Sequence, residues 1–230
     1  FLGYRQGSLQ HSNLGDPNLF TSGGERGQGR EITGLTVGVD SSLVIHLEEG
    51  INILQGTTAS EFVLKSYSST SGAFKNTPKR LLGSIFFVDD RGLTTMEAVQ
   101  EFGDYASNSI SQRFKQTLLS KTHAITGTLV SRDLNQYRIF FDDRRQIWVS
   151  FEGKEFKGAT FVEYPLVVNV MAGGENNENK EFLIFASTED DGRVFRMDSG
   201  RSFDGNNIVT RMTTPFFHYG SPRRWKAFKR

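Results

Sequence analysis

The feature that most constrains this sequence is a hairpin pattern that recurs five times. In each copy an apolar segment leads into a polar turn, and a second segment follows. The turn residue expected to take a positive φ lies at Gly7, Gly50, Gly92, Arg145 and Gly192, in steps of 43, 42, 53 and 47 residues. The predicted arms are Phe1–Tyr4 with Ser8–His11, Leu43–Leu47 with Ile51–Leu54, Ile85–Val88 with Leu93–Met96, Tyr137–Phe141 with Gln146–Phe151, and Phe182–Ala186 with Arg193–Met197.

The composition of the turns has a conformational reason. An Asp side chain bonds its own backbone in a turn, and Gly accepts the positive φ that a tight hairpin requires. Only the fourth turn lacks Gly, and we expect Arg145 to take its place. Acidic pairs recur in the turns, at Glu48/Glu49, Asp89/Asp90, Asp142/Asp143 and Asp190/Asp191. This repeated placement favours turn formation over a single active site, although a turn rich in Asp could also bind calcium.

The spacing predicts an all-β protein built as a β-propeller-like array. Four-stranded blades repeat at about 40–45 residues, so two of the steps fit and two carry small insertions. We therefore expect a β-propeller domain over residues 1–220, with about five blades, and incomplete in this chain. A sandwich or another stack of sheets remains open, since turns recur every 8–12 residues in any all-β protein.

Several predicted strands are apolar at consecutive positions, which indicates burial on both faces of a sheet. They are Phe182–Ala186, Ile85–Val88 and Leu166–Val168. Stacked blades provide such double cover, and the 20 Phe among 230 residues would fill the wedges between them.

One helix is expected, inserted near 109–119 on the rim of the array. Ser109 and Gln112 have the spacing of a capping box. Two segments are expected to be loops: the polar stretch Gly173–Lys180 and the glycine-rich stretch Thr21–Arg30.

Composition excludes several classes of protein and site. The chain has no Cys, which excludes disulfide scaffolds, thiolate zinc sites and cysteine nucleophiles. Apolar runs stay well short of a membrane span. The four histidines, His11, His46, His123 and His218, are scattered and lack metal-binding spacing. We therefore expect a non-enzymatic protein with no catalytic residue, no cofactor and no metal site.

The charge is unevenly distributed along the chain. Residues 221–230 hold five basic residues and no acidic one, whereas the rest holds 22 basic and 26 acidic residues. Basic residues interleaved with aromatic ones suit phosphate contact and base stacking. The same alternation also predicts a half-buried basic exit strand. The candidates for assembly or nucleic-acid contact are Arg223, Arg224, Trp225 and Lys226.

Several segments resemble one family when they are taken in order. The segment Gly3–Pro17 contains a Ser-x-x-Gly-Asp-Pro loop at its end. It is similar to a loop of the tail nozzle, or tail tubular protein B, family of short-tailed bacteriophages, which is related to packaged-DNA stabilisation proteins. Further segments that carry the resemblance are Ile51–Gly56, Phe62–Leu64, Gly72–Ala73, Ile85–Leu93, Phe102–Asp104, Arg211–Pro215 and Gly220–Pro222.

The resemblance implies a virion structural protein. Family members form a ring, usually six-fold, below the portal and its adaptor, and their propellers surround the channel through which genomic DNA leaves. The implied partners are copies of the chain, the portal or adaptor, other tail proteins and the passing DNA. The implied location is the virion tail, assembled in the host cytoplasm. Family proteins are longer at both ends, and the start at Phe1, far ahead of the first Met, Met96, indicates a fragment or a processed product.

Two other functions remain open. The acidic pairs could serve a carbohydrate-active or glycan-binding propeller, because glycosidases use two facing carboxyl groups. A propeller could also be an intracellular scaffold for peptide partners. For a DNA channel, we expect the acidic hairpin turns rather than the basic end to face the channel or its rim, since dense positive charge would retard the sliding of DNA.

Overall fold

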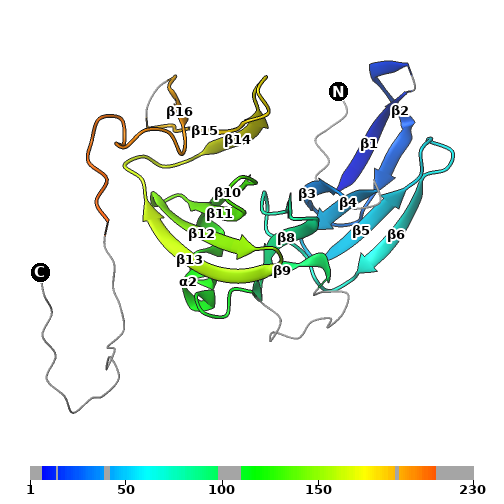
Figure 1. Ribbon diagram of the computed structural model, residues 1–230. Helices are drawn as coiled ribbons and strands as arrows, with labels where there is room; N and C mark the ends of the chain where they lie inside the picture. Colours follow the sequence, from blue (N-terminus) through cyan, green and yellow to red (C-terminus); the bar gives the residue numbers. More distant parts are fainter. Residues whose placement is uncertain (1–6, 14, 39–41, 98–109, 190–191, 211–230) are drawn as a thin grey trace, which may run out of the picture. The chain divides into compact units, whose positions relative to one another are not determined.

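The computed structural model describes residues 7–13, 15–38, 42–97, 110–189 and 192–210 (Figure 1). The chain divides into two compact units, Phe1–Asp198 and Ser199–Arg230. In the second unit, Phe203 and Asn206 form an isolated antiparallel bridge. The predicted exit strand at 221–230, with Arg223, Arg224, Trp225 and Lys226, lies outside the described residues.

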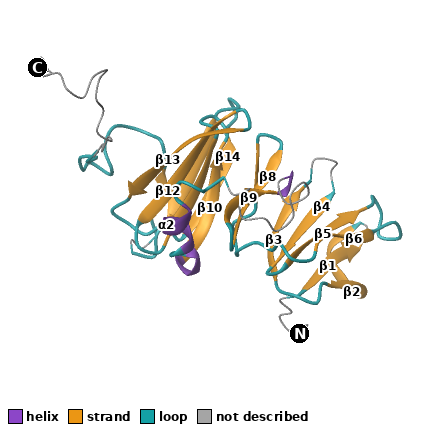
Figure 2. Ribbon diagram, turned by 90° about the horizontal axis from the view of Figure 1, so that it is seen from below, coloured by secondary structure: helices purple, strands orange, loops and turns teal. Residues whose placement is uncertain are grey.

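The first unit consists of antiparallel sheets whose strands follow one another in sequence (Figure 2). The N-terminal hairpin has β1 (Ser8–Asn13) and β2 (Asp16–Gly27). Sheet 1 has β3 (Ile32–Val37), β4 (Leu43–Leu47), β5 (Gly50–Gln55) and β6 (Val63–Ser68). Sheet 2 has β7 (Lys79–Leu81), β8 (Ser84–Asp89) and β9 (Gly92–Thr95). Sheet 3 has β10 (Ile125–Ser131), β11 (Gln136–Phe141), β12 (Arg145–Glu152) and β13 (Glu155–Glu163). Sheet 4 has β14 (Val170–Glu175), β15 (Glu181–Ala186) and β16 (Val194–Arg196). The prediction of an all-β fold is confirmed.

Four of the five predicted hairpins are present, and each joins the second and third strands of its sheet. Gly50, Gly92 and Gly192 take φ values of 125°, 115° and 75°, as their turns require. In the fourth hairpin the prediction that Arg145 takes the positive φ was wrong. Arg144 has the positive φ, 69°, and Arg145 is the first residue of β12. The turn is therefore one residue shorter than expected.

The first predicted hairpin lies partly outside the described residues, and its second arm forms a pairing that the sequence did not predict. Ser8–His11 lies in β1, which pairs with β2 in the register Ser8 to Gly27, and Phe1–Tyr4 lies outside the described residues. Gly7 does not take a positive φ; an added Cβ there would lie 2.9 Å from the backbone oxygen of Arg30. The expected loop at Thr21–Arg30 is largely strand, because β2 continues to Gly27.

Sheet 2 is covered on both faces, as the apolar run in β8 predicted. Ile85 and Phe87 pack with Val44 and Ile51 of sheet 1. The alternate residues Phe86 and Val88 pack instead into a core shared with sheet 3, which includes Tyr137, Ile139, Ile147 and Val149. Successive side chains of a strand point to opposite faces, so β8 contributes to two cores at once.

Sheet 4 packs on the other face of sheet 3 through an aromatic series. Trp148 contacts Tyr164 edge to face, at 6.4 Å between ring centroids, and Tyr164 contacts Phe185 at 5.5 Å. Phe185 stacks on Phe195 of β16 at 5.1 Å. Sheet 3 is therefore also covered on both faces.

Two sequence predictions in this region are corrected. Leu166–Val168 is not a strand. The strand in this region, β14, begins at Val170, and its residues Met171 and Gly173 pair with β15. The loop expected at Gly173–Lys180 is limited to residues 176–180, because Gly173 and Gly174 belong to β14. Their lack of a side chain reflects close packing, since an added Cβ at Gly173 would lie 2.9 Å from Leu183.

The helix is shorter and more buried than expected. Of the predicted Ser109–Leu119, only α2 (Lys115–Leu119) is helical. Ser109 lies outside the described residues, and the N-cap is Phe114, which makes no side-chain capping bond. Phe114 and Leu118 are buried in the core of sheets 2 and 3, so apolar packing rather than a capping box sets this helix. A 3-10 turn, η2 (Thr122–Ala124), follows the helix. No helix in the described part of the chain is long and apolar enough to span a membrane.

Candidate functional site

The first unit has a groove of about 760 Å³ that is bordered by the first strand of every sheet from 1 to 4. It is lined by residues 35–37 of β3, by Lys79 and Arg80 of β7 with the preceding Pro78, by residues 129–130 of β10 with Arg132, by residues 171–175 of β14, and by Glu181 of β15. Segments as far apart in the sequence as Leu35 and Glu181 therefore share one surface.

Close backbone packing brings β3 and β10 up to the start of β7. An added Cβ at Gly34 would lie 2.9 Å from the ring of Pro78, so only glycine fits this approach without a shift. On the other side, the Thr128 hydroxyl lies 3.0 Å from the carbonyl oxygen of Asn76. These contacts place sheet 2 between sheets 1 and 3 at the groove.

The third junction, between β10 and β14, uses the same kind of contact. An added Cβ at Gly127 would meet the Met171 side chain at 3.1 Å, and one at Gly173 would lie 3.7 Å from Leu129. Small residues on the first strands thus permit the four strands to approach in sequence order.

Each first strand is also the edge of its sheet. In the described chain, β3, β7, β10 and β14 each pair with one strand only. An edge strand presents backbone N–H and C=O groups that can pair with an extended chain. The groove therefore offers backbone hydrogen-bonding groups as well as side chains.

The charged residues of the groove differ in how they are neutralised. Arg132 pairs with Glu175 at 2.9 Å, and the Arg80 guanidinium donates to the carbonyl oxygen of Gly38 at 3.2 Å. Glu181 is occupied by the β10–β11 turn, since it accepts hydrogen bonds from the backbone N–H groups of Arg132 and Asp133, at 2.8 and 3.2 Å.

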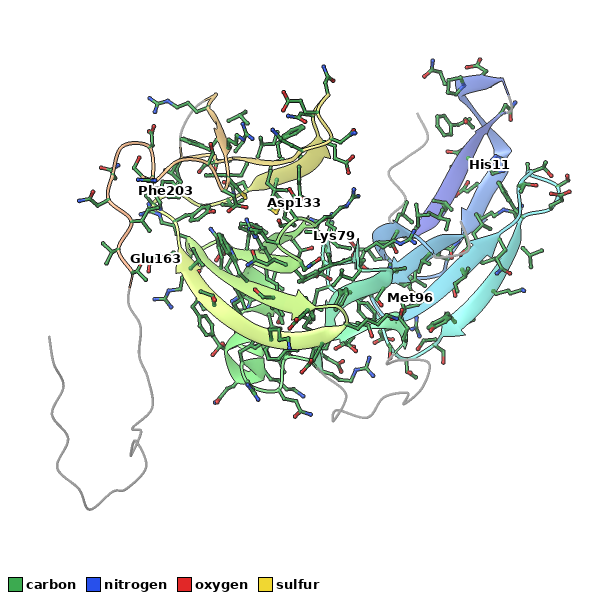
Figure 3. The ribbon with its side chains drawn as sticks, in the orientation of Figure 1. His11, Lys79, Met96, Asp133, Glu163 and Phe203 are labelled. Carbon is green, nitrogen blue, oxygen red and sulfur yellow. The ribbon has the colours of Figure 1, made fainter. Side chains whose placement is uncertain are left out.

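Lys79 is the exception. Its half-buried ammonium group forms no hydrogen bond or ion pair with the described residues, and burial lowers its pKa. Figure 3 labels Lys79 on β7 and Asp133 in the β10–β11 turn. A cation that is partly withdrawn from water and lacks a counter-charge favours an anionic group beside it. The groove is thus suited to an extended polypeptide backbone or an anionic group.

The histidines are structural where the structure describes them. His46 is fully buried with its Nε2 atom 3.0 Å from the Thr36 hydroxyl, and His11 contacts Phe62 edge to face. His123 lies in η2, and His218 lies outside the described residues. Among the described residues, no three potential metal ligands lie close enough to hold an ion.

The acidic pairs that the structure describes lie at the hairpin turns, as expected, and Asp190/Asp191 lies outside the described residues. The Asp89 carboxylate accepts a hydrogen bond from the backbone N–H of Arg91 at 2.9 Å, and Asp143 accepts one from that of Arg145 at 3.2 Å. The structure also brings Glu48, Glu49, Asp89 and Asp90 to one cleft, which the sequence did not indicate.

The groove itself was missed by sequence reasoning. Its charged residues are isolated in the sequence, and the first strands are short or contain glycine, so they lack the strong apolar signal of the hairpins. The one available signal was the blade period, which would have placed a first strand ahead of each hairpin.

The sequence matches no protein-family model, and no curated protein matches it.

Proposed function

We propose that this chain is a structural subunit of a virion tail, of the tail nozzle type, and that sheets 1 to 4 are successive blades of a propeller. The proposal is supported by the family resemblance of its loop and hairpin segments and by the arrangement of its sheets. In this function the molecule is not an enzyme: copies of it assemble into a ring, six-fold as is usual in the family, around the path of the DNA below the portal and adaptor.

The observation that carries the proposal is the serial packing of the sheets. Each sheet is an antiparallel meander, sheets 2 and 3 are covered on both faces, and the four first strands meet in sequence order along one groove. Radial repetition of blades gives this order, with the first strand of each blade nearest the axis. A two-layer sandwich leaves one face of each sheet towards solvent and does not account for it.

The mechanical role follows from the packing. Phe86, Tyr137 and Phe151 belong to the core between sheets 2 and 3, with ring centroids 6.1 Å and 4.8 Å from Phe86. Such cores are close-packed and resist deformation. A subunit of this kind would form a rigid wall around a channel, in keeping with an assembly protein of the tail.

Electron microscopy of the purified chain, alone and mixed with portal–adaptor complexes, tests the proposal. We expect ring-shaped particles, or density added below the adaptor, at micromolar concentrations of the chain. A strictly monomeric particle at high concentration, with no affinity for adaptor rings, would contradict a nozzle function. A parallel measurement of mass by light scattering separates rings from irregular aggregates.

A further inference from the structure

A second concave surface, the acidic cleft, lies between the hairpin turns of sheets 1 and 2. It has a volume of about 450 Å³. Its charged lining residues are Glu31, Glu48, Glu49, Lys75, Asp89 and Asp90. Five carboxyl groups and a single lysine thus border one small space, so the cleft carries a strong negative charge.

The carboxyl groups are only partly neutralised by the surrounding chain. Asp89 is buried against Arg91, and Glu31 pairs with Lys75 at 3.5 Å. Glu49 lies 3.2 Å from Arg30, but both side chains are exposed, so water weakens this pair. The side chain of Glu48 has no hydrogen-bond or ion-pair partner in the described part of the chain. Asp90 lies 3.9 Å from Arg91 with its side chain 90% exposed, which makes that pair weak.

An independent observation points to a ligand in the same cleft. Thr33 is only 8% exposed, and its hydroxyl oxygen is buried without a hydrogen-bond partner among the described residues. A buried hydroxyl that lacks a partner costs free energy, so it favours a polar group that could complete its bonding. Ala73 and Phe74 line the cleft beside it and supply apolar surface.

We propose that the acidic cleft binds a basic polypeptide segment, with an arginine or lysine side chain inserted between the two hairpin turns. The exposed carboxylates of Glu48, Glu49 and Asp90 accept hydrogen bonds from the guanidinium or ammonium group, and the Thr33 hydroxyl accepts one more. The aliphatic stem of the inserted side chain covers Ala73 and Phe74.

The spread of the acids argues for such a ligand over a bare metal ion. The described residues contain no group of three carboxylates or histidines close enough to hold an ion. A guanidinium group presents five donors in a planar fork and can reach carboxylates that are farther apart. Charge complementarity therefore selects an arginine- or lysine-rich segment as the occupant.

The inference goes beyond the proposed tail function and does not depend on it. A suitable probe is a fluorescein-labelled peptide with the sequence of residues 221–230, which carries five basic residues beside Trp and Phe. It is titrated into the full chain in which all five of these basic residues, Arg223, Arg224, Lys226, Lys229 and Arg230, are changed to Gln, so that the chain offers no basic competitor there. Fluorescence anisotropy measures the affinity, and no portal or adaptor is present.

We expect the triple variant Glu48→Gln, Glu49→Gln, Asp90→Asn to weaken peptide binding by about tenfold. These side chains are solvent-exposed, so the fold is retained. The matched control removes three exposed acids elsewhere, at Glu152, Glu155 and Glu178, and should change the affinity less than about twofold.

The Thr33→Val variant supplies a second readout. Its isosteric side chain removes the hydroxyl, so we expect a loss of about threefold in affinity without a loss of thermal stability. A peptide with Gln at its five basic positions should not bind. Equal losses of affinity in both triple variants would show that the peptide is attracted by overall charge alone, and this would overturn the proposal. Failure of the basic peptide to bind the chain would also overturn it.

Discussion

His46 is a buried ionisable residue whose environment makes stability depend on pH. It is fully buried on β4, with its ring centroid 5.4 Å from that of Phe87, and burial lowers its pKa from 6.5 to about 4. Between these values the unfolded chain binds a proton that the folded chain does not. The free energy of unfolding therefore falls as the pH decreases from 6.5 to 4, with a slope approaching about 1.4 kcal/mol per pH unit from this group.

Urea unfolding at pH 7, 5.5 and 4.5 measures this dependence in the unsubstituted chain and in a His46→Gln variant. We expect the variant to be less stable at pH 7 but to lose less of its stability on acidification. Identical pH slopes for the two proteins would contradict the assignment to His46.

Arg138 is a buried charge that an acidic partner balances. Its side chain is fully buried, lies 3.8 Å over the Trp148 ring and pairs with Asp198 at 2.8 Å. Because the Asp198 side chain is 31% exposed, we expect Asp198→Asn to lower the free energy of unfolding by about 2 kcal/mol rather than by the larger loss of a fully buried pair. Asn also tolerates the positive φ of 52° at this position.

The same urea measurement on the double variant Asp198→Asn, Arg138→Met separates charge from packing. Removing the unpaired cation as well should recover part of the lost stability. If the double variant were the less stable of the two, the loss would come from packing at Arg138 rather than from an unpaired charge.

At the scale of elements, Gly72 fixes the connection between β6 and β7 against the β4–β5 turn. An added Cβ would lie 1.9 Å from the backbone oxygen of Glu48, and the next residue, Ala73, donates its N–H to Leu47 at 2.9 Å. Gly72→Ala must therefore shift the backbone of sheet 1 or of the connection. We expect the variant to lose about 2–4 kcal/mol in free energy of unfolding.

Gly158→Ala on β13 is the matched control, since an added Cβ there meets no atom within 4 Å. Its stability should stay within about 1 kcal/mol of the unsubstituted chain or rise slightly. Thermal unfolding followed by circular dichroism compares the two variants. Equal melting temperatures would show that the segment at Gly72 relaxes at no cost.

The accuracy of the sequence predictions also varies by element. Hairpins such as Leu43–Leu47 with Ile51–Leu54 were predictable because their turns are encoded by a few adjacent residues. The first strands were not, because they are positioned by distant contacts, such as that of Thr128 with Asn76. The helix was overextended because its capping pattern is local, whereas burial of Phe114 and Leu118 decides where it begins.

The candidate site illustrates the same distinction. No pattern at Lys79 indicated a groove, since its lining comes from four sheets. The three acidic pairs that the structure describes were correctly predicted to lie at turns. The convergence of two of them, Glu48/Glu49 and Asp89/Asp90, at the acidic cleft depends on the packing of sheet 1 on sheet 2. Local chemistry was thus readable from the sequence, whereas the meeting of separate elements was not.

At the scale of the whole first unit, sheet 2 couples its neighbours because β8 faces two cores. Phe87 faces sheet 1, whereas the preceding residue, Phe86, faces sheet 3. Loss of packing on one face should therefore destabilise both neighbouring sheets, and sheets 1 to 3 should unfold together.

A Phe87→Ala variant tests this coupling. Phe87 is fully buried, so we expect a loss of about 3–5 kcal/mol in the free energy of unfolding. Trp225 is changed to Phe in every sample, so that the tryptophan fluorescence comes from Trp148 alone. Trp148 lies in sheet 3, whose core does not include Phe87, and its fluorescence therefore reports on the unfolding of that sheet. The Trp148 fluorescence transition in urea should shift together with the circular dichroism transition. Phe161→Ala, at a residue 59% exposed, is the control and should shift neither. A Trp148 midpoint that stays in place while the circular dichroism midpoint falls would show that the sheets unfold independently, and it would remove the basis for treating them as one rigid wall.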